Sequence, residues 1–339
     1  MPASSPPAAP APDQPTEGKK PLSNLAQRLI FGVLGAVALL GCVWYSAWTF
    51  ALFFAAVQAK MLLEFYRMMR AGGYQPAKWL GLAASVVIFA AVNIYSGISH
   101  YLHLPSFKGG YTVYPSLRAD DEAYAGMGAS NEMFDATFLM GTLPKIYAGF
   151  GAVLLLLMLA LVMWEMAKWP KEKHPFINVS TAYGGLFYVS LPMSLLSLIA
   201  FGGNGQYDYR RIFALLFLVW CSDIGAYAAG KTFGKHKLAP KISPGKTWEG
   251  AVGGFLLTLA MGWALGYWLT DLSLTYRLVA AGTVAVFGPL GDLAESMLKR
   301  SVDVKDSGTI MPGHGGLLDR FDAFLFILPV LALLQLLLG

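Results

Sequence analysis

The sequence has little charge and almost no cysteine. Only 13% of its 339 residues are Asp, Glu, Lys or Arg, whereas 56% are hydrophobic, and the mean hydropathy is +0.52. Such values lie outside the range of ordinary soluble domains and indicate a polytopic membrane protein. The two cysteines, Cys42 and Cys221, both lie in apolar stretches. A disulfide framework is therefore not expected, and no redox motif is present.

The N-terminal segment lacks the features of a secretory signal. Residues 1–20 are rich in Pro, Ala and Ser and do not follow the basic-then-apolar order of a signal peptide. Because this composition buries too little apolar surface to offset the entropy of ordering, we expect residues 1–22 to form a disordered cytoplasmic tail. The net charge of +5 is weak evidence for nucleic-acid binding, and we expect no nucleic-acid partner.

Long apolar runs recur along the rest of the chain. A membrane-spanning helix needs roughly 20 apolar residues. We therefore predict an all-α, polytopic integral membrane bundle of about nine transmembrane helices, with a polar cavity that faces the cytoplasm. The predicted spans are about 25–45, 46–66, 79–98, 145–166, 180–201, 211–230, 250–270, 277–298 and 321–338.

The distribution of basic residues predicts the orientation. Most of the 25 lysines and arginines lie in segments on the same side of the membrane as the N-terminus. By the positive-inside rule, the N-terminus and the lysine-rich loop 231–249 are cytoplasmic, and we expect the protein in the inner, cytoplasmic membrane. This topology explains most of the basic excess.

We divide the membrane region into two halves. Residues 23–210 form an N-terminal transmembrane half with the outer loop 99–143, and residues 211–339 form a C-terminal catalytic half. The outer loop shows no chemical motif. An insertion is the favoured interpretation, and a lid or a partner surface stays open.

Acidic residues inside the apolar spans are candidates for function, because ionisable groups in a bilayer are costly. Asp223 and Asp292 lie at matching depths in two spans, and Pro289 interrupts the helix just before Asp292. Asp319 and Asp322 share a helix face at the start of the last span. Antiparallel spans joined by a short loop can bring these acids together. Converging carboxylates without a matching base predict a hard-cation site, and magnesium suits oxygen ligands with phosphate partners.

Other acids and the single nearby histidine have simpler interpretations. Asp303 and Asp306 are equally well explained as helix-end partners of Lys or Arg. A lone histidine such as His314 is more often a hydrogen-bonding loop residue, so we do not assign it as a metal ligand.

Two patterns surround the lysine-rich loop. Residues 225–232, "GAYAAGKT", match the P-loop letters, but they lie at the end of a predicted transmembrane helix whose amides are already bonded, so we reject a P-loop. Residues 231–250 contain five lysines, of which Lys246 follows a predicted Pro-Gly turn. Clustered lysines bind phosphate as point charges, although binding of anionic lipid is the alternative. Gly250 and Gly254 form a small-xxx-small pair that predicts helix packing.

The C-terminal motifs resemble those of the phosphatidate cytidylyltransferases, the CDP-diacylglycerol synthases. That family's signature runs S-x-x-K-R-x4-K-D, then P-G-H-G-G, then D-R-x-D. Here it consists of Ser296, Lys299, Arg300, Lys305, Asp306, Pro312, Gly313, His314, Gly315, Gly316, Asp319, Arg320 and Asp322. The upstream motifs appear as Asp223, Ala226, Tyr227, Gly230, and then Ser243, Pro244, Lys246, Thr247, Glu249 and Gly250. The resemblance covers about residues 220–322.

The resemblance implies the reaction of CTP with phosphatidate to give CDP-diacylglycerol and pyrophosphate. The lipid phosphate would attack the α-phosphorus of CTP in line, with magnesium as cofactor, alone or with a second cation. The partners implied are CTP, phosphatidic acid, membrane lipid and a second copy of the chain in a homodimer. These are expectations for the site and for the assembly.

The resemblance also implies residue roles. Asp292 and Asp319 would be the main metal ligands, supported by Asp223 and Asp322. The catalytic set would be Asp292, Asp319, Lys299 and Arg300. The substrate-binding set would be Lys246, Ser243, Thr247, Glu249, Ser296, Lys305, Asp306, Gly313, His314, Gly315, Gly316, Arg320 and Tyr227.

Two alternatives compete with this assignment. An ion-coupled transporter also carries intramembrane acids, but it typically places them near the midplane of repeated halves, and no repeat is evident here. The second alternative is another lipid enzyme, either a CTP-dependent lipid kinase or an amino-alcohol phosphotransferase. The pattern of the amino-alcohol phosphotransferases, D-G-x2-A-R-x8-G-x3-D-x3-D, is absent from the sequence.

Overall fold

The computed structural model describes residues 24–97, 151–170, 174–202, 205–308 and 315–338. The predicted tail 1–22 and outer loop 99–143 lie outside the described residues, as do Gly313 and His314.

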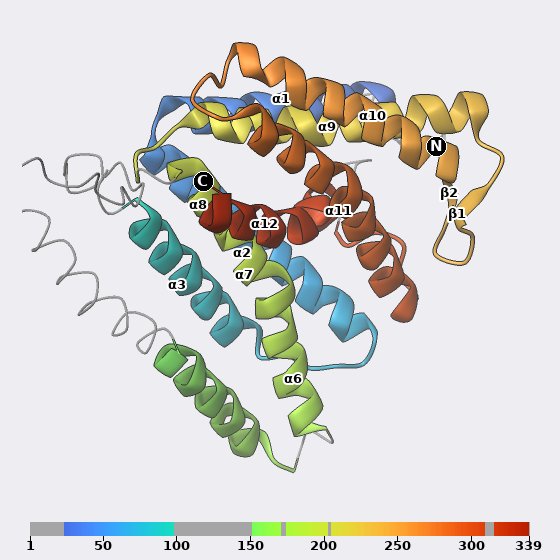
Figure 1. Cartoon of the computed structure of the whole chain (residues 1–339). Helices are drawn as coiled ribbons and strands as arrows, with labels where there is room; N and C mark the ends of the chain where they lie inside the picture. The colour runs from blue at the N-terminus through green and yellow to red at the C-terminus, as the bar shows by residue number, and fades with distance from the viewer. Residues whose placement is uncertain (1–23, 98–150, 171–173, 203–204, 309–314, 339) are drawn as a thin grey trace, which may run out of the picture.

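Helices make up most of the described chain (Figure 1). They are α1 (Asn24–Tyr45), α2 (Ala47–Ala71), α3 (Lys78–Ser96), the helix Gly151–Lys168, α6 (Pro175–Gly185), α7 (Leu191–Ser194), α8 (Leu196–Phe201), α9 (Tyr209–Phe233), α10 (Trp248–Ala264), α11 (Leu274–Ser301) and α12 (Leu318–Leu338). A π-helical turn, Leu186–Ser190, joins α6 to α7, so that Pro175–Phe201 is one apolar helical run.

The prediction of a polytopic helical bundle is confirmed. Within the described residues, eight helices are long and apolar enough to cross a membrane. The first predicted span coincides with α1, in which Gly32–Tyr45 is a shorter apolar helix. The closeness of the first two spans is explained by a capping box at Ser46. Its side chain accepts a hydrogen bond from the Thr49 amide, and Thr49 Oγ1 accepts one from the Ser46 amide, so α2 begins directly after α1 ends.

The pair α9 and α10 packs backbone against backbone. A Cβ atom added to Gly225 would lie 2.8 Å from the Gly253 carbonyl oxygen, and one added to Gly254 would lie 2.8 Å from the Ser222 carbonyl oxygen. Gly250 likewise approaches the Ala226 carbonyl, as its small-xxx-small spacing predicts. Residues 225–232 lie inside the continuous helix α9, which agrees with the rejection of a P-loop.

A short β-hairpin joins α9 to α10 and is the one element of the described chain that an all-α prediction does not contain. Strands β1 (Lys237–Ala239) and β2 (Ser243–Thr247) are antiparallel. The Ile242 amide closes the turn on the Ala239 carbonyl at 3.1 Å. The predicted Pro-Gly turn is wrong, because Pro244 and Gly245 lie inside β2. Figure 1 shows the hairpin extending beyond the ends of α9 and α10.

The core combines elements from both predicted halves. Buried side chains of α2, such as Phe50 and Phe54, share one cluster with Met193 of α7 and with Phe324 and Leu328 of α12. The predicted division into 23–210 and 211–339 stays a prediction, and the shared core shows that the two ranges are packed together.

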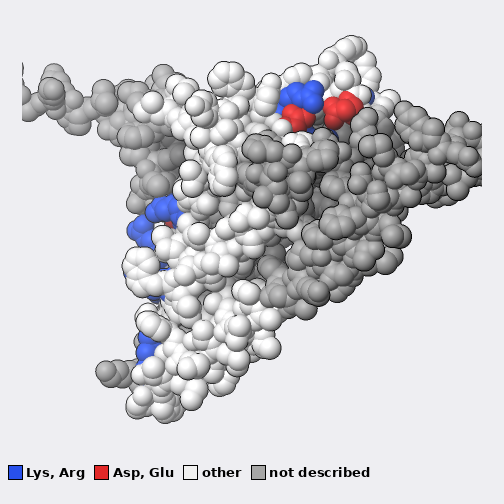
Figure 2. Space-filling model, turned by 90° about the vertical axis from the view of Figure 1, so that its left-hand side faces the viewer, with Lys and Arg blue, Asp and Glu red and all other residues white. Residues whose placement is uncertain are grey.

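Charge is sparse on the face that Figure 2 presents. Most of its described surface is neither acidic nor basic, and acidic and basic side chains gather together near the top. At the N-terminal end of α9, Asp208 and Asp271 form ion pairs with Arg210 and Arg211 at distances from 2.8 to 3.9 Å. Such pairing reduces the free energy needed to keep charged groups at the end of an apolar bundle.

Candidate active site

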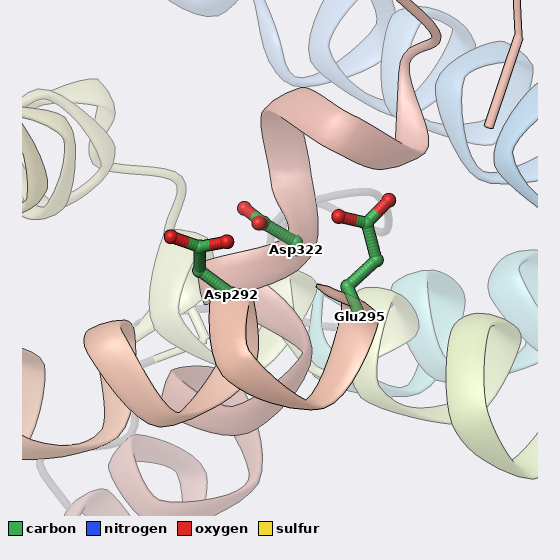
Figure 3. A group of neighbouring side chains, drawn as sticks. All are labelled: Asp292, Glu295 and Asp322. Atoms are coloured by element: carbon green, nitrogen blue, oxygen red, sulfur yellow. The ribbon is translucent and has the colours of Figure 1, made fainter. Parts of the chain in front are cut away.

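Three carboxylates from two helices converge inside the bundle. Asp292 and Glu295 lie three residues apart on α11, and Asp322 projects from the second turn of α12 (Figure 3). One carboxylate oxygen of each lies within 4.8 Å of the others. We call Asp292, Glu295 and Asp322 the carboxylate group. Carboxylate oxygens at this spacing fit a hard divalent cation.

Close contact of α11 with α12 creates this group. A Cβ atom added to Gly291 would lie 2.6 Å from the Asp322 carbonyl oxygen, so only glycine allows the helices to approach this closely. We expect Gly291→Ala to push α12 away from α11 and to lower activity by at least about tenfold, because small misplacements of reacting groups are costly. Gly282→Ala, on the same helix, is the matched control, since a Cβ atom at Gly282 would meet nothing within 4 Å. Equal activity of both variants would contradict the prediction.

Lys246 reaches the carboxylate group from strand β2. Its Nζ lies 2.7 Å from Asp292 Oδ2 and donates a hydrogen bond of 3.0 Å to the Pro289 carbonyl oxygen. Pro289 lies inside α11, where a proline interrupts the backbone hydrogen bonding of the helix. The hairpin thus brings a cation to the proline-containing turn of α11.

Asp319 holds a different set of partners. Its carboxylate accepts hydrogen bonds from Lys299 Nζ at 2.7 Å, from the Ser307 hydroxyl at 2.8 Å and from the Gly316 amide at 2.7 Å. Lys299 Nζ also bonds Glu295 Oε2 at 2.8 Å. Asp319 therefore links both ends of the loop 307–316 to Lys299 of α11. It is connected to the carboxylate group only through Lys299, which also bonds Glu295.

The predicted acidic residues thus do not all lie in one group of contacts. Asp292 and Asp322 meet in the carboxylate group, whereas Asp319 lies beside it, and the role of Asp319 as a main metal ligand stays a prediction. Asp223 lines the same cavity from α9 and interacts electrostatically with Asp292 and Lys246.

Sequence reasoning assigned no ligand role to Glu295. It is fully buried, and its Oε1 accepts no hydrogen bond from any described residue. The signal was its i, i+3 spacing from Asp292, which places both side chains on one helix face.

A cavity of about 1160 Å³ surrounds these groups. Its charged wall includes Asp223, Lys246, Asp292, Glu295, Lys299, Asp319, Arg320 and Asp322. Its apolar wall comes from α1, α2, α9 and α12 and includes Gly35, Leu39, Phe53, Val57, Val219 and Phe324. One cavity therefore offers both a charged surface and a long apolar surface, which suits an amphipathic ligand.

Comparisons with known proteins identify the family of the chain. The profile described as "Cytidylyltransferase family" matches residues 116–338, well over half of the chain. The chain belongs to the cytidylyltransferase family. The resemblance found in the motifs is thereby confirmed at the level of the family.

Curated relatives of this cytidylyltransferase include two bacterial proteins named phosphatidate cytidylyltransferase. The relative from Bacillus subtilis (strain 168) is 49% identical over 128 residues, which are 37% of this chain and 47% of the relative. The relative from Staphylococcus aureus (strain COL) is 50% identical over 166 residues, 48% of this chain and 62% of the relative. The chain thus matches from about half to somewhat less than two thirds of the length of these relatives.

Two predicted residues outside the carboxylate group hold α10 and the hairpin in place. The Thr247 side chain caps α10 by accepting from the Gly250 amide at 3.1 Å. Glu249 accepts from the Lys235 amide at 3.1 Å and pairs with His236 Nδ1 at 2.6 Å, so it fixes the base of the hairpin.

The other predicted residues divide into those that lie at the cavity or contact the acids and those that lie outside the cavity wall. Ser296 Oγ lies 3.3 Å from Asp292 Oδ1, and Tyr227 and Ser243 line the cavity. Gly315 has a φ of +80°, and a Cβ atom there would lie 2.6 Å from Asp319 Oδ2. The second group consists of Arg300, Lys305 and Asp306, which are exposed and are not part of the cavity wall. Their predicted substrate contacts stay predictions.

Proposed function

We propose that this cytidylyltransferase transfers the CMP unit of CTP to phosphatidate and releases pyrophosphate. The observation that carries the proposal is the carboxylate group with Lys246 and Lys299 inside a cavity that is also walled by apolar side chains. The names of the relatives support the same lipid substrate and nucleotide.

The chemistry requires a new bond between a lipid phosphate oxygen and the α-phosphorus of CTP. The bond from that phosphorus to the oxygen that bridges to the β-phosphate breaks, and pyrophosphate leaves with the electron pair. The nucleophile is already an anion, so no strong general base is needed. Catalysis then depends on positioning and on neutralising negative charge. Lys246 and Lys299 would supply the positive charge.

A divalent cation fits the acidic part of the site. The buried Glu295 Oε1 accepts no hydrogen bond within the described residues, and hard oxygen ligands are those that magnesium prefers. Asp292, Glu295 and Asp322 would hold the ion, with Asp223 nearby. When bound, magnesium would offset negative charge on the triphosphate and on the leaving pyrophosphate.

We place the lysine-rich hairpin and the site on the cytoplasmic side of the inner membrane, where CTP is available. Lys231, Lys235, Lys237 and Lys241 are exposed around the hairpin, as the positive-inside rule predicts for a cytoplasmic segment. The apolar wall formed by α1, α2 and α9 would receive the acyl chains of the lipid from the bilayer. A homodimer stays a prediction.

The test is a reaction in detergent micelles or vesicles that contain phosphatidate, CTP and magnesium. With CTP labelled at the α-phosphate, label should enter the lipid, and one pyrophosphate should be released for each CDP-diacylglycerol formed. Entry of label from the γ-phosphate instead would identify a lipid kinase. No lipid product together with discharge of a solute gradient would identify a transporter.

Lys246→Ala tests the contribution of the hairpin. We expect a several-fold to roughly 10²-fold rise in the KM for CTP, because a charge-assisted contact to phosphate would be lost. The KM for phosphatidate should change less. Lys241→Ala is the matched control, since Lys241 lies on the same hairpin but is exposed. An unchanged KM for CTP in Lys246→Ala would remove this residue from the nucleotide site.

A further inference from the structure

Glu64 is a buried acid in the N-terminal half of the chain that contacts the signature segment near the site. It lies on α2, and only 1% of its surface is exposed. Its Oε2 accepts a hydrogen bond of 2.9 Å from the amide of Leu318, the first residue of α12. This contact joins residues separated by 254 positions in the sequence.

Two glycines allow the Glu64 carboxylate to enter the loop. A Cβ atom on Gly308 would lie 2.5 Å from Glu64 Oε1, and one on Gly316 would lie 2.5 Å from Oε2. These glycines stand at the two ends of the loop. The carboxylate therefore fills the space that side chains at these positions would otherwise occupy.

The loop ends are held from two directions. Asp319 accepts from the amides of Ser307 and Gly316, while Glu64 contacts Gly308, Gly316 and the start of α12. Asp322, a member of the carboxylate group, lies four residues after Leu318. The orientation of Glu64 thus bears on the placement of both Asp319 and Asp322.

Helix packing in the membrane does not by itself explain a buried carboxylate at position 64. Lys60 Nζ lies 3.7 Å from Glu64 Oε1, a loose contact, and that oxygen accepts no hydrogen bond within the described residues. Burial of a carboxylate with incomplete pairing lowers stability. An apolar residue would suit helix packing better, whereas only an acceptor can bind the Leu318 amide.

We propose that Glu64 is a positioning residue of the active site: it anchors the first turn of α12 and the adjoining loop so that Asp319 and Asp322 face α11. The inference rests on the proposed function for its kinetic consequences. Its structural consequence can be measured without any activity.

Hydrogen–deuterium exchange of the full-length protein in detergent is the direct test. In Glu64→Ala, peptides that contain Leu318 should exchange at least about tenfold faster, because the amide loses its acceptor. Glu64→Gln keeps an acceptor oxygen and should exchange at an intermediate rate or at the wild-type rate. Unchanged exchange in Glu64→Ala would overturn the proposal.

Glu165 provides a matched control. It is 2% exposed, its Oε2 accepts from Asn178 at 3.0 Å, Lys168 lies 3.6 Å from its Oε1, and that oxygen also lacks a hydrogen bond within the described residues. Its contacts join two helices away from the loop. Glu165→Ala should leave exchange at Leu318 unchanged; faster exchange there in both variants would indicate general destabilisation and would overturn a specific role for Glu64.

Kinetics supply the second readout. Glu64→Ala should lower kcat by roughly 10- to 100-fold, as expected for small misplacements in an active site, and raise the magnesium concentration for half-maximal rate. Glu64→Gln should restore much of the rate, and Glu165→Ala should keep it. Wild-type kcat and magnesium dependence in Glu64→Ala would contradict the proposal.

A double-mutant cycle tests the contact itself. Gly308→Ala places a methyl group against Glu64 Oε1 and should lower activity, whereas the same change in Glu64→Ala protein meets an empty space and should have little further effect. Additive losses would show that the two residues act independently. If the wild-type protein forms no CDP-diacylglycerol, the proposed function fails, and the exchange result still decides the role of Glu64.

Discussion

Asp292→Asn is expected to lower turnover by roughly 10²-fold or more while the protein still folds. Asp292 belongs to the carboxylate group and forms an ion pair with Lys246 at 2.7 Å. The change removes the negative charge that would bind a cation and that pairs with this lysine. Loss of a single electrostatic stabiliser typically has an effect of this size. Initial rates at saturating CTP and phosphatidate, measured across a magnesium titration, provide the measurement.

Asp303→Asn is the control for this change. Asp303 follows α11, is exposed, and has a φ of 54°, a conformation that asparagine also adopts readily. Its activity should match that of the wild type. A normal rate in Asp292→Asn at saturating magnesium would remove Asp292 from the mechanism.

Asp322→Asn and Asp319→Asn should both lose activity by about 10²-fold, but for different reasons. Asp322 lies in the carboxylate group, so its replacement should raise the magnesium requirement sharply. Asp319 holds Lys299, Ser307 and Gly316, so its replacement should loosen the loop with a smaller change in that requirement.

Exchange rates and metal dependence together separate the two aspartates. Exchange in peptides that contain Ser307 should be faster in Asp319→Asn than in Asp322→Asn. The opposite result, with the metal requirement raised mainly by Asp319→Asn, would favour the sequence-based assignment of Asp319 as a main ligand. Melting temperatures in detergent should confirm that both variants are folded before the rates are compared.

The helical bundle could be predicted because apolar runs of membrane length are strong signals. The eight long apolar helices and α1 correspond to the predicted spans, with shifted ends such as Pro175 and Leu318. The hairpin could not be predicted, because strands of three and five residues with one lysine each carry no clear alternation. Its form also depends on the hydrogen bonds of Glu249 to Lys235 and His236, which lie 14 and 13 positions away at the base of the hairpin.

The sequence indicates which acidic residues gather at the site better than it indicates how their side chains are oriented. Asp319 and Asp322 are three residues apart, so helical periodicity places them together and cannot show which one turns toward Asp292. Their separation depends on the loop, where Ser307 and Gly316 bind Asp319. The sequence around Glu64 does not indicate its contact with α12, because an acid four residues after Lys60 resembles an ordinary i, i+4 pair.

The glycine contacts between α9 and α10 have a mechanical consequence. With backbone against backbone at Gly225 and Gly254, no deformable layer of side chains separates the two helices. They should shift as one stiff unit, carrying Asp223 and the root of the hairpin together. Any movement of α11 and α12 against this unit would change how Asp223 faces Asp292 and Asp322 across the cavity.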